Sequence, residues 1–337
     1  MMNWKDKVIL VTGGTGSFGK KFIQVMLEEI HPKKTIVFSR DELKQYEMQS
    51  SGYDHPNLRY FLGDVRDRDR LRRAMNGVDI VVHAAALKQV PACEYNPMEA
   101  VKTNIMGTSN VVEAALDAGV KKVLAISTDK AVNPVNLYGA TKLAAEKLVI
   151  QSNAYAAGTA TRYSCVRYGN VVGSRGSVVP VFLKQRQSGQ LSITDARMTR
   201  FWLSLEQGVR FVIHCIEEME GGEVFVPHIP SMKVIDLARA IAPEAQVNVI
   251  GIRPGEKLHE VLISEDESRN TVEMEDKFVV QPAEALWFGY SWHEKGKLLP
   301  DGFRYASDDN TDWLDIEGIR KLVAPFEEMF DKGKLEG

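Results

Sequence analysis

The sequence predicts an α/β protein with a doubly wound parallel sheet and a smaller C-terminal lobe. Short apolar runs such as residues 123–126 have the composition of strands that are buried on both faces. Helical patterns alternate with these runs, and a glycine-rich turn joins the first run to the first helix. The 337 residues suffice for two units, which we place at residues 1–168, with later segments returning to it, and residues 169–337.

Composition excludes several classes of protein. Hydrophobic residues make up 44% and charged residues 26% of the chain, as in ordinary soluble globular proteins. A net charge of −3 offers no overall attraction to nucleic acid, and no apolar run is as long as a membrane span. Three widely spaced cysteines, Cys93, Cys165 and Cys215, argue against disulfides and a metal site. The N-terminus shows no signal-peptide pattern, so we expect a cytoplasmic protein with no nucleic-acid or membrane partner.

The first predicted strand, residues 7–12, leads into a glycine-rich turn and a helical pattern. Gly14, Gly16 and Gly19 form G-x-G-x-x-G, and Gly13 precedes them. Glycines let the backbone approach a pyrophosphate, and a helix N-terminus supplies amide donors. Between a strand and a helix this motif predicts a Rossmann-like dinucleotide site. The candidate cofactor-binding residues here are Gly13, Thr15, Gly16, Ser17, Phe18 and Gly19.

The end of the second predicted strand, residues 35–38, bears on the choice of cofactor. Arg40 is the first ionic residue and suits the 2′-phosphate of NADP, whereas Asp41 could serve the ribose of NAD. We favour NADP. The alternative is that Arg40 and Lys44 only solvate a helix start. The candidate cofactor residues of this segment are Ser39, Arg40, Asp41, Lys44 and Gln45.

The third and fourth predicted strands, residues 58–62 and 79–83, each end at candidate cofactor residues. Asp64 follows the third strand and is equally suited to cap a helix. Three alanines follow the fourth strand and allow a cofactor to pass close to the backbone, and Lys88 comes next. We expect His83 to be a packed core histidine and not a catalyst.

The segment 127–142 carries the candidate catalytic residues. The strand at residues 123–126 delivers Thr128, Asp129 and Lys130 to its carboxyl edge, where open α/β sheets bind ligands. Tyr138 and Lys142 are four residues apart, so a helix places them on one face. An ammonium near a phenol lowers its pKa and makes Tyr138 a candidate general base. Alone, Tyr-x-x-x-Lys more often marks a solvated helix face, but the preceding strand and the nucleotide loop favour catalysis.

This arrangement resembles the extended, nucleotide-sugar branch of the short-chain dehydrogenase/reductase superfamily. The resemblance implies that Asp64 and Val65 contact adenine and that Ala84 and Ala86 line the cofactor site. It implies that Asn104 braces the active site. It also implies that the predicted helices 97–118 and 138–157 pair across a dimer as a four-helix bundle, so that the protein is a homo-oligomer.

Three later loops, residues 168–180, 195–201 and 251–257, are rich in glycine or arginine and open a less regular region. Arginines on loops suit a diphosphate, which accepts bidentate hydrogen bonds. We expect residues from about 265 onward to form an acidic, loop-rich cap that ends in a helix near 316–329. The candidate substrate-binding residues are Lys88, Asn170, Val178, Thr194, Arg197, Arg253 and Glu256.

Five segments in order, residues 84–91, 127–131, 136–142, 167–177 and 251–260, resemble the inverting UDP-N-acetylglucosamine 4,6-dehydratases of pseudaminic acid biosynthesis. Neighbouring families depart at named positions. Retaining sugar dehydratases have glutamate where this chain has Lys130, and related capsule-sugar enzymes lack the equivalent of Tyr138. The larger membrane-bound dehydratases carry an N-terminal membrane region, which we do not expect here because no apolar run of this sequence is long enough to span a membrane.

The resemblance implies a reaction on UDP-N-acetylglucosamine that gives UDP-2-acetamido-2,6-dideoxy-β-L-arabino-hex-4-ulose, with NADP recycled in each turnover. Tyr138 takes the 4-hydroxyl proton, Thr128 binds the reacting oxygen, and Lys142 lowers the pKa of Tyr138 and binds the nicotinamide ribose. By analogy Lys130 is the base at C5 and Asp129 the acid at the 6-hydroxyl. A lysine serves as a base only where burial or nearby cations lower its pKa.

Three other functions stay open at this point. A UDP-sugar 4-epimerase uses the same tyrosine and lysine but needs no Asp-Lys pair. A retaining 4,6-dehydratase differs in the configuration that it leaves at C5. An NADP-sensing binding protein on this fold typically loses the tyrosine or the lysine, and this chain keeps both.

Overall fold

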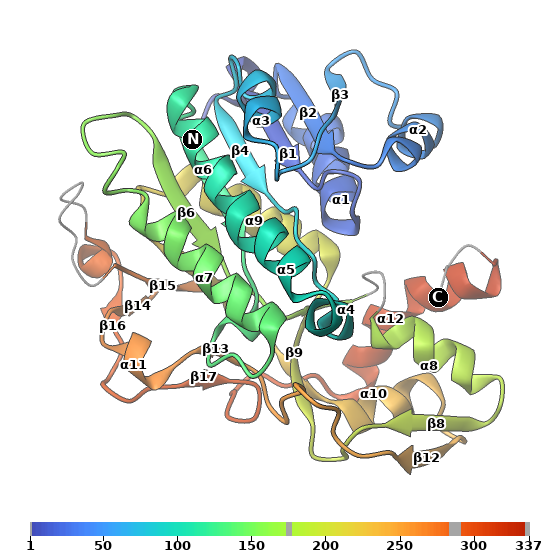
Figure 1. Ribbon diagram of the computed structural model, residues 1–337. Helices are drawn as coiled ribbons and strands as arrows, with labels where there is room; N and C mark the ends of the chain where they lie inside the picture. The colour runs from blue at the N-terminus through green and yellow to red at the C-terminus, as the bar shows by residue number, and fades with distance from the viewer. Residues whose placement is uncertain (1, 173–176, 283–290, 334–337) are drawn as a thin grey trace.

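The computed structural model describes residues 2–172, 177–282 and 291–333, and in it a large sheet lies between two layers of helices (Figure 1). Within these residues the sheet has the strand order β16-β14-β15-β10-β6-β5-β4-β1-β2-β3. The part from β3 to β10 is parallel, and the chain reverses direction across the sheet between β1 and β4. This confirms the doubly wound parallel sheet. Its strands are β1 Val8–Thr12, β2 Lys34–Ser39, β3 Leu58–Leu62, β4 Ile80–His83, β5 Lys122–Ile126, β6 Arg162–Val166, β10 Val224–Pro227, β14 Thr271–Glu273, β15 Lys277–Val280 and β16 Lys297–Leu298.

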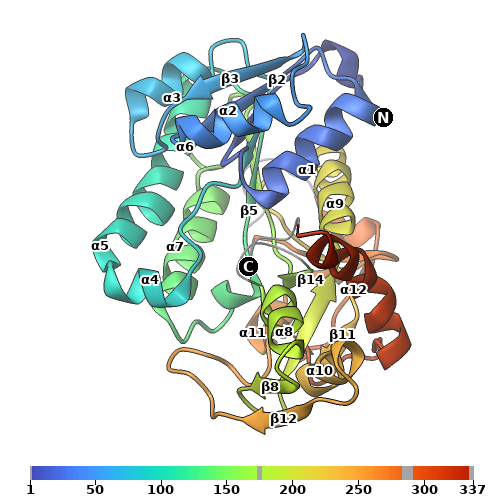
Figure 2. The same cartoon turned by 90° about the vertical axis from the view of Figure 1, so that its right-hand side faces the viewer.

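Helices cover both faces of the sheet, with α6 and α7 on one side and α1 and α9 on the other (Figure 2). This cover explains why β1, β4 and β5 are almost continuously apolar and buried. The helices of this domain are α1 Ser17–Val25, α2 Glu42–Ser50, α3 Arg68–Ala74, α4 Val90–Tyr95, α5 Pro97–Ala100, α6 Gly107–Asp117, α7 Leu137–Gln151 and α9 Leu205–Glu218. Short 3-10 turns lie at Trp4–Asp6, Asp129–Ala131 and Trp292–Glu294, and a π turn at Met26–Ile30.

The predicted helix 97–118 is present and unbroken from residue 97 to 117, but it is not α-helical throughout. It consists of α5, a π-helical segment Val101–Met106, and α6. The buried Asn104 lies in the π-helical segment, accepts a hydrogen bond from Leu87 N (2.8 Å) and donates one to Leu87 O (2.9 Å). Such π segments are frequent at functional sites. Here the segment clamps the chain that follows β4, which agrees with the expected bracing role of Asn104.

The second lobe has its own hydrophobic core, which includes Phe182, Trp202, Met232 and Leu237. Its strands form three small sheets within the described residues. They are β7 Asn170–Val171, β9 Thr199–Leu203 and β11 Ser231–Lys233; β8 Gln190–Ile193 and β12 Gln246–Val249; and β13 Val261–Ile263 and β17 Tyr305–Ala306. Its helices are α8 Val178–Arg186, α10 Val234–Ile241, α11 Glu265–Ser268 and α12 Ile316–Asp331.

The expected loop-rich cap from residue 265 onward is partly wrong. The last helix is present as α12, but β14 and β15 form an antiparallel extension of the main sheet next to β10. All four residues of β15 are buried. The sequence did not predict this hairpin because its strands have only three and four residues. Acidic residues end the first strand and fill the turn: Glu273, Glu275 and Asp276.

Candidate active site

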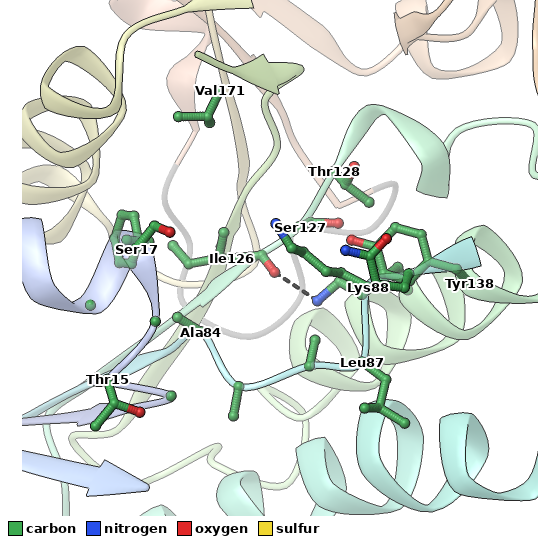
Figure 3. Close-up of a pocket in the computed structure, with 18 of the residues that line it drawn as sticks. Thr15, Ser17, Ala84, Leu87, Lys88, Ile126, Ser127, Thr128, Tyr138 and Val171 are labelled. Atoms are coloured by element: carbon green, nitrogen blue, oxygen red, sulfur yellow. Dashed lines mark hydrogen bonds between the residues drawn. The ribbon is translucent and has the colours of Figure 1, made fainter. Parts of the chain in front are cut away.

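A cavity of about 680 Å³ opens at the carboxyl ends of β1, β2, β4 and β5, where parallel sheets bind ligands (Figure 3). Residues of the second lobe, such as Trp202 and Val178, close its other side. Most of the predicted site residues line this cavity. They are Gly13, Thr15, Gly16, Ser17, Phe18, Gly19, Ser39, Arg40, Asp41, Lys44, Asp64, Val65, Ala84, Ala86, Lys88, Thr128, Asp129, Lys130, Tyr138, Lys142, Asn170 and Val178.

Five predicted residues do not line the cavity: Gln45, Thr194, Arg197, Arg253 and Glu256. Gln45 is buried, and its Nε2 donates to the carbonyl oxygens of Ser39 (2.9 Å) and Phe61 (3.3 Å). These bonds tie the ends of β2 and β3 together. In this structure Gln45 therefore supports the cofactor loop from behind and does not face it.

The other four residues lie on two loops that follow β8 and β12. These strands are parallel, so the loops leave from the same edge. Arg197 is exposed and pairs with Asp195 (2.8 Å). The second loop reaches the catalytic segment, because Asn136 Nδ2 donates to Gly255 O (2.7 Å) and Lys257 Nζ to Val132 O (2.5 Å). The loop of Arg253 and Glu256 thus flanks the cavity without lining it.

The glycine turn leaves no room for side chains. Gly13 has a φ of 67°, and a Cβ there would lie 2.9 Å from Ala85 Cα. A Cβ on Gly19 would lie 2.5 Å from Gly14 Cα. The turn therefore packs tightly between the end of β4 and the start of α1, whose N-cap is Gly16. This is the cradle that a dinucleotide pyrophosphate requires, so the residues present fit such a cofactor.

The two charged residues after β2 have different surroundings. Asp41 caps α2: its carboxylate accepts from Lys44 N (3.0 Å) and pairs with Lys44 Nζ (2.8 Å). These contacts lower the pKa of Asp41. The Arg40 side chain is 55% exposed, and its Nη1 lies 3.8 Å from Asp64 Oδ2. Asp41 thus caps the helix start, and both Asp41 and Arg40 line the cavity.

The alternative of Asp64 as a helix cap is wrong, because Asp67 caps α3 by accepting from Arg70 N (2.9 Å). Asp64 instead bonds to Arg66 and lines the cavity. His83 is a packed core histidine, as expected: its ring is buried between the hydroxyls of Thr12 (2.8 Å) and Thr108 (3.0 Å). Burial lowers the pKa of His83 to about 3, so the ring stays neutral.

The segment that holds the predicted catalytic residues begins with a short 3-10 turn, Asp129–Ala131, after β5 and continues into α7. Thr128 Oγ1 donates to Asp129 Oδ1 (2.7 Å), and Lys130 Nζ lies 3.1 Å from the same oxygen. Gly139 of α7 has no room for a Cβ, which would collide with the Lys130 carbonyl oxygen. The helix that carries Tyr138 therefore packs directly onto the turn. All of the predicted catalytic residues line the cavity, and Figure 3 labels Thr128 and Tyr138 among them.

Several polar atoms on the cavity wall are buried and have no hydrogen-bond partner among the described residues. They include Asp129 Oδ2, Asn170 Oδ1 and Trp202 Nε1. A buried polar atom without a partner costs about 1–3 kcal/mol. The residues that carry these atoms line a cavity whose wall combines charged, glycine and apolar residues, so the wall can pair polar groups of a ligand while it buries the apolar parts.

The predicted effect of Lys142 on Tyr138 is wrong for this structure. Lys142 Nζ donates to Ile126 O (2.7 Å), as Figure 3 marks at Ile126. Burial raises the pKa of Tyr138 to about 12, and the groups that lower it are Lys130 and Thr128. Burial also lowers the pKa of Lys142. The spacing of Tyr138 and Lys142 predicts that they share one helix face, but the Lys142 ammonium donates its hydrogen bond to the Ile126 carbonyl of β5.

Sequence reasoning assigned no role to Glu260, although it ends the segment 251–260 that carried the family resemblance. Glu260 is buried, and its Oε1 lies 3.3 Å from Lys130 Nζ. The condition for Lys130 as a base is also not met. Burial lowers the pKa of Lys130, but Asp129 and Glu260 outweigh burial and raise it above the usual lysine value. Glu260 is therefore the main residue of this site that the sequence did not identify.

No helix in the described ranges is both long and apolar enough to cross a bilayer. In the same ranges no group of three or more His, Cys, Asp and Glu side chains is arranged to hold a metal ion.

Comparisons with known proteins agree with this geometry. The family model described as "Polysaccharide biosynthesis protein" matches residues 9–282. The UDP-N-acetylglucosamine 4,6-dehydratase (inverting) of Campylobacter jejuni is 54% identical, over 95% of this chain and 98% of that protein. The UDP-glucose 4-epimerase of Rickettsia rickettsii is 40% identical, over 94% of this chain and 95% of that protein.

Solved structures give the same picture. Pen from Bacillus thuringiensis has a TM-score of 0.88 and 38% identity, and the match covers 97% of this chain and 99% of Pen. DesIV, a dTDP-glucose 4,6-dehydratase from Streptomyces venezuelae solved with NAD and TYD, has a TM-score of 0.67 and 24% identity over 74% of this chain and 86% of DesIV. The second match supports the fold alone. The chain therefore belongs to the polysaccharide biosynthesis protein family, in the group that contains the inverting UDP-N-acetylglucosamine 4,6-dehydratases.

Proposed function

We propose that this protein is an inverting UDP-N-acetylglucosamine 4,6-dehydratase, a hydro-lyase that keeps NADP bound through each turnover. One observation carries the proposal. A glycine cradle for a dinucleotide and the side chains of Thr128, Asp129, Lys130 and Tyr138 line the same cavity. The relative of that activity is 54% identical over 95% of the chain. The proposed reaction gives the 4-keto-6-deoxy-L-arabino sugar nucleotide. We therefore expect the enzyme to catalyse the first step of pseudaminic acid biosynthesis.

The side chains divide the work of this reaction. The bound dinucleotide supplies the hydride acceptor and the hydride donor. Tyr138 accepts the proton of the 4-hydroxyl, and Thr128 orients the reacting oxygen. A ketone at C4 acidifies the C5 proton, so that a base removes it and water leaves from C6. Asp129 and Lys130 carry the proton transfers at C5 and at the 6-hydroxyl, because they lie next to Thr128 on the cavity wall.

The direct test needs the purified protein and UDP-N-acetylglucosamine without added cofactor. We expect a product lighter than the substrate by one water, detected by mass spectrometry, because the hydride is returned in each turnover and no cofactor is consumed. UDP-glucose under the same conditions is the comparison substrate. Unchanged mass after prolonged incubation with saturating added NADP contradicts the proposal.

A UDP-sugar 4-epimerase is the second candidate function, since the R. rickettsii epimerase is 40% identical over most of the chain. Epimerisation uses the tyrosine and the lysine of the helix but no acid or base at C5. Asp129 Oδ2 is buried and has no hydrogen-bond partner in the part of the chain that the structure describes, and Lys130 lies beside Asp129. That arrangement favours dehydration. An epimerase would give a product of unchanged mass with the 4-hydroxyl inverted.

The preference for NADP rests on Arg40. Asp41 is occupied as the cap of α2, so Arg40 is the charged side chain at this corner that suits a 2′-phosphate. We expect wild-type protein to bind NADP more tightly than NAD, and Arg40→Ala to lose about 1.5–3 kcal/mol of that preference, roughly tenfold to a hundredfold in affinity. Titration calorimetry with both cofactors on apoprotein measures this. Glu47→Ala, an exposed residue of the following helix α2, is the control, and equal wild-type affinities for the two cofactors contradict the assignment.

We also propose a homodimer formed through α4 to α7. Exposed apolar side chains gather on these helices, including Tyr95 (87% exposed), Met98 (59%) and Met106 (54%). An apolar helical surface of this kind is typical of an interface between subunits. Light scattering during size exclusion gives the mass of the assembly in solution.

A further inference from the structure

Two short segments, one from the first domain and one from the second lobe, meet beside the cavity. The connector, residues 132–136, joins the 3-10 turn after β5 to α7, the helix that carries Tyr138. The clamp loop, residues 255–257, follows β12 in the second lobe. The contact between Asn136 and Gly255 joins positions 119 apart in the chain, so only the tertiary structure brings the two segments together.

Two hydrogen bonds in opposite directions join the connector to the clamp loop. Asn136 Nδ2 donates to Gly255 O (2.7 Å), and Lys257 Nζ donates to Val132 O (2.5 Å). The Lys257 side chain is only 13% exposed, so water competes little for its bond. We call this pair of bonds the interlobe clamp. It holds the connector at both of its ends.

The Asn136 side chain uses both of its polar atoms. Its Oδ1 accepts a hydrogen bond from Gly139 N (2.8 Å) and caps α7, while its Nδ2 makes the bond to Gly255. A cap of this kind fixes the first turn of a helix, and Tyr138 lies in that turn. One side chain therefore links the second lobe to the turn that holds Tyr138.

The clamp loop approaches the connector as closely as a glycine permits. Gly255 has a φ of 74°, and a Cβ there would lie 3.0 Å from Asn136 Cβ. The loop is also fixed within its own lobe, because the buried Arg200 of β9 donates through Nη2 to Lys257 O (3.0 Å). The same strand carries Trp202, which lines the cavity. A continuous path of contacts therefore runs from the cavity wall of the second lobe to the cap of α7.

The connector has an unfavourable backbone conformation. Asn133 has a φ of 44°, in the left-handed region, and the next residue is Pro134. A residue before proline is normally extended, because the proline ring collides with more compact conformations of its neighbour. Such backbone strain persists where the surroundings fix it, and it gathers at functional sites. The clamp bonds at Val132 and Asn136 lie on either side of Asn133 and provide this restraint.

We propose that Asn136 and Lys257 are positioning residues, and that the interlobe clamp holds the connector so that Tyr138 meets the substrate in the correct place. The inference rests on the proposed dehydratase activity and links the second lobe to its first oxidation step. A ligand packed against the wall of the second lobe restrains β9, and β9 restrains the clamp loop through Arg200. A displacement of about 1 Å at a reacting group costs roughly a hundredfold in rate, so the restraint has a kinetic consequence.

The test uses Asn136→Asp. Aspartate caps helices as well as asparagine does, so Gly139 N keeps its acceptor. The carboxylate has no donor for Gly255 O and repels that oxygen, so the variant breaks one clamp bond and leaves the helix cap. Gly255→Ala disrupts the same contact from the other side without a change in charge, because of the positive φ and the close Asn136 Cβ.

The first readout is hydrogen–deuterium exchange of the intact protein, measured by mass spectrometry, and it needs no activity. Two regions are compared with wild type: the connector with the first turn of α7, and the clamp loop. We expect both variants to raise the exchange rate about tenfold in both regions, since each region restrains the other. Faster exchange in only one region, or in neither, overturns the proposal, whether or not the protein is a dehydratase.

The second readout is the rate constant of C4 oxidation in a single turnover, followed by the absorbance of the reduced nicotinamide. We expect Asn136→Asp to lower it about tenfold to a hundredfold, with the wild-type amount of bound cofactor. The double variant Asn136→Asp/Gly255→Ala should be no slower than the slower single variant, because both changes break one contact. Faster exchange with a wild-type rate constant overturns the proposal. If wild-type protein does not oxidise the sugar, the proposed function fails, while the exchange measurement still decides whether the clamp exists.

Asn310→Asp is the matched control. Asn310 is also partly buried, its Oδ1 accepts from Asp312 N (3.3 Å), and its Nδ2 donates to Ile229 O (2.9 Å) in a distant segment. The substitution thus removes the same kind of bond at a residue that does not line the cavity. It should lower the melting temperature and leave the exchange of the connector and the oxidation rate unchanged. If it alters both as much as Asn136→Asp does, the effect is general destabilisation and the assignment to the interlobe clamp fails.

Discussion

Replacing Tyr138 by phenylalanine is expected to lower the dehydration rate about 10²–10⁴-fold, the usual loss when a general base is removed. The side chain is buried on the cavity wall beside Thr128 and Lys130, and the variant removes only the hydroxyl. The fold and the cofactor should stay. Single-turnover absorbance at the wavelength of the reduced nicotinamide shows whether C4 oxidation, the first step, is the one that is lost.

The pH dependence of that step has a defined sign. Burial raises the pKa of Tyr138 to about 12 in the protein without ligands, so the phenol form dominates at neutral pH. Below this pKa the phenolate fraction therefore grows about tenfold for each unit of pH. A bound positive charge lowers the pKa of Tyr138. We expect the rate of C4 oxidation to rise with pH, and binding of the oxidised cofactor to move this rise toward neutral pH.

Tyr163→Phe is the matched control for Tyr138→Phe. Tyr163 is fully buried, and its hydroxyl donates to Val112 O (2.9 Å) in the core of the first domain. Its loss should cost about 1 kcal/mol of stability and no activity. Turnover of Tyr138→Phe near the wild-type rate would make Tyr138 an ordinary helix residue and remove the basis of the proposed chemistry.

The second large effect is expected for Lys130→Ala, which should reduce formation of the finished product about 10²–10⁴-fold by removing a proton-transfer group. In D₂O the wild-type product should carry deuterium at C5, since the proton delivered there comes from an exchangeable group. Substrate labelled with deuterium at C4 should give product with that deuterium at C6. NMR of the product measures both positions and the C5 configuration.

The control for this variant is Lys122→Ala. Lys122 Nζ donates to the carbonyl oxygens of Ile216 (2.7 Å) and Glu217 (3.0 Å), and it lies at the opposite end of β5 from the catalytic turn. Its loss should affect stability and not the isotope pattern. A product with D-xylo configuration at C5 would refute inversion, and full activity of Lys130→Ala would leave Asp129 to perform every proton transfer.

The sequence predicted the cofactor side of the cavity more fully than the side with the candidate catalytic residues. Around the cofactor, strand and turn are contiguous, so Gly13, Gly16 and Gly19 were found from one local motif. The role of Asp41 was ambiguous because a carboxylate after a strand can cap a helix or bind a ribose; the structure shows the helix cap through the bonds to Lys44. Gln45 failed as a predicted contact for a similar reason, since its direction depends on the packing of β2 against β3.

The electrostatics of the catalytic turn depended on residues distant in the sequence. The spacing of Tyr138 and Lys142 correctly placed them on α7 but predicted a lowered pKa for Tyr138, whereas burial raises it. The sequence shows neither this burial nor the hydrogen bond from Lys142 to the Ile126 carbonyl. The pKa of Lys130 is raised by its neighbour Asp129 and also by Glu260, which is 130 positions away in the chain and lies just before β13.

The doubly wound sheet, the glycine turn and the candidate catalytic residues could be predicted from the sequence alone, because each depends on a local pattern of a few residues. The tertiary structure decided which of these groups face the cavity, which oxygen atoms are left without partners and which charges surround Lys130. These properties depend on burial and on through-space distances of 3–4 Å between segments far apart in the chain, such as the Lys130 and Glu260 side chains at 3.3 Å, and no local pattern encodes them.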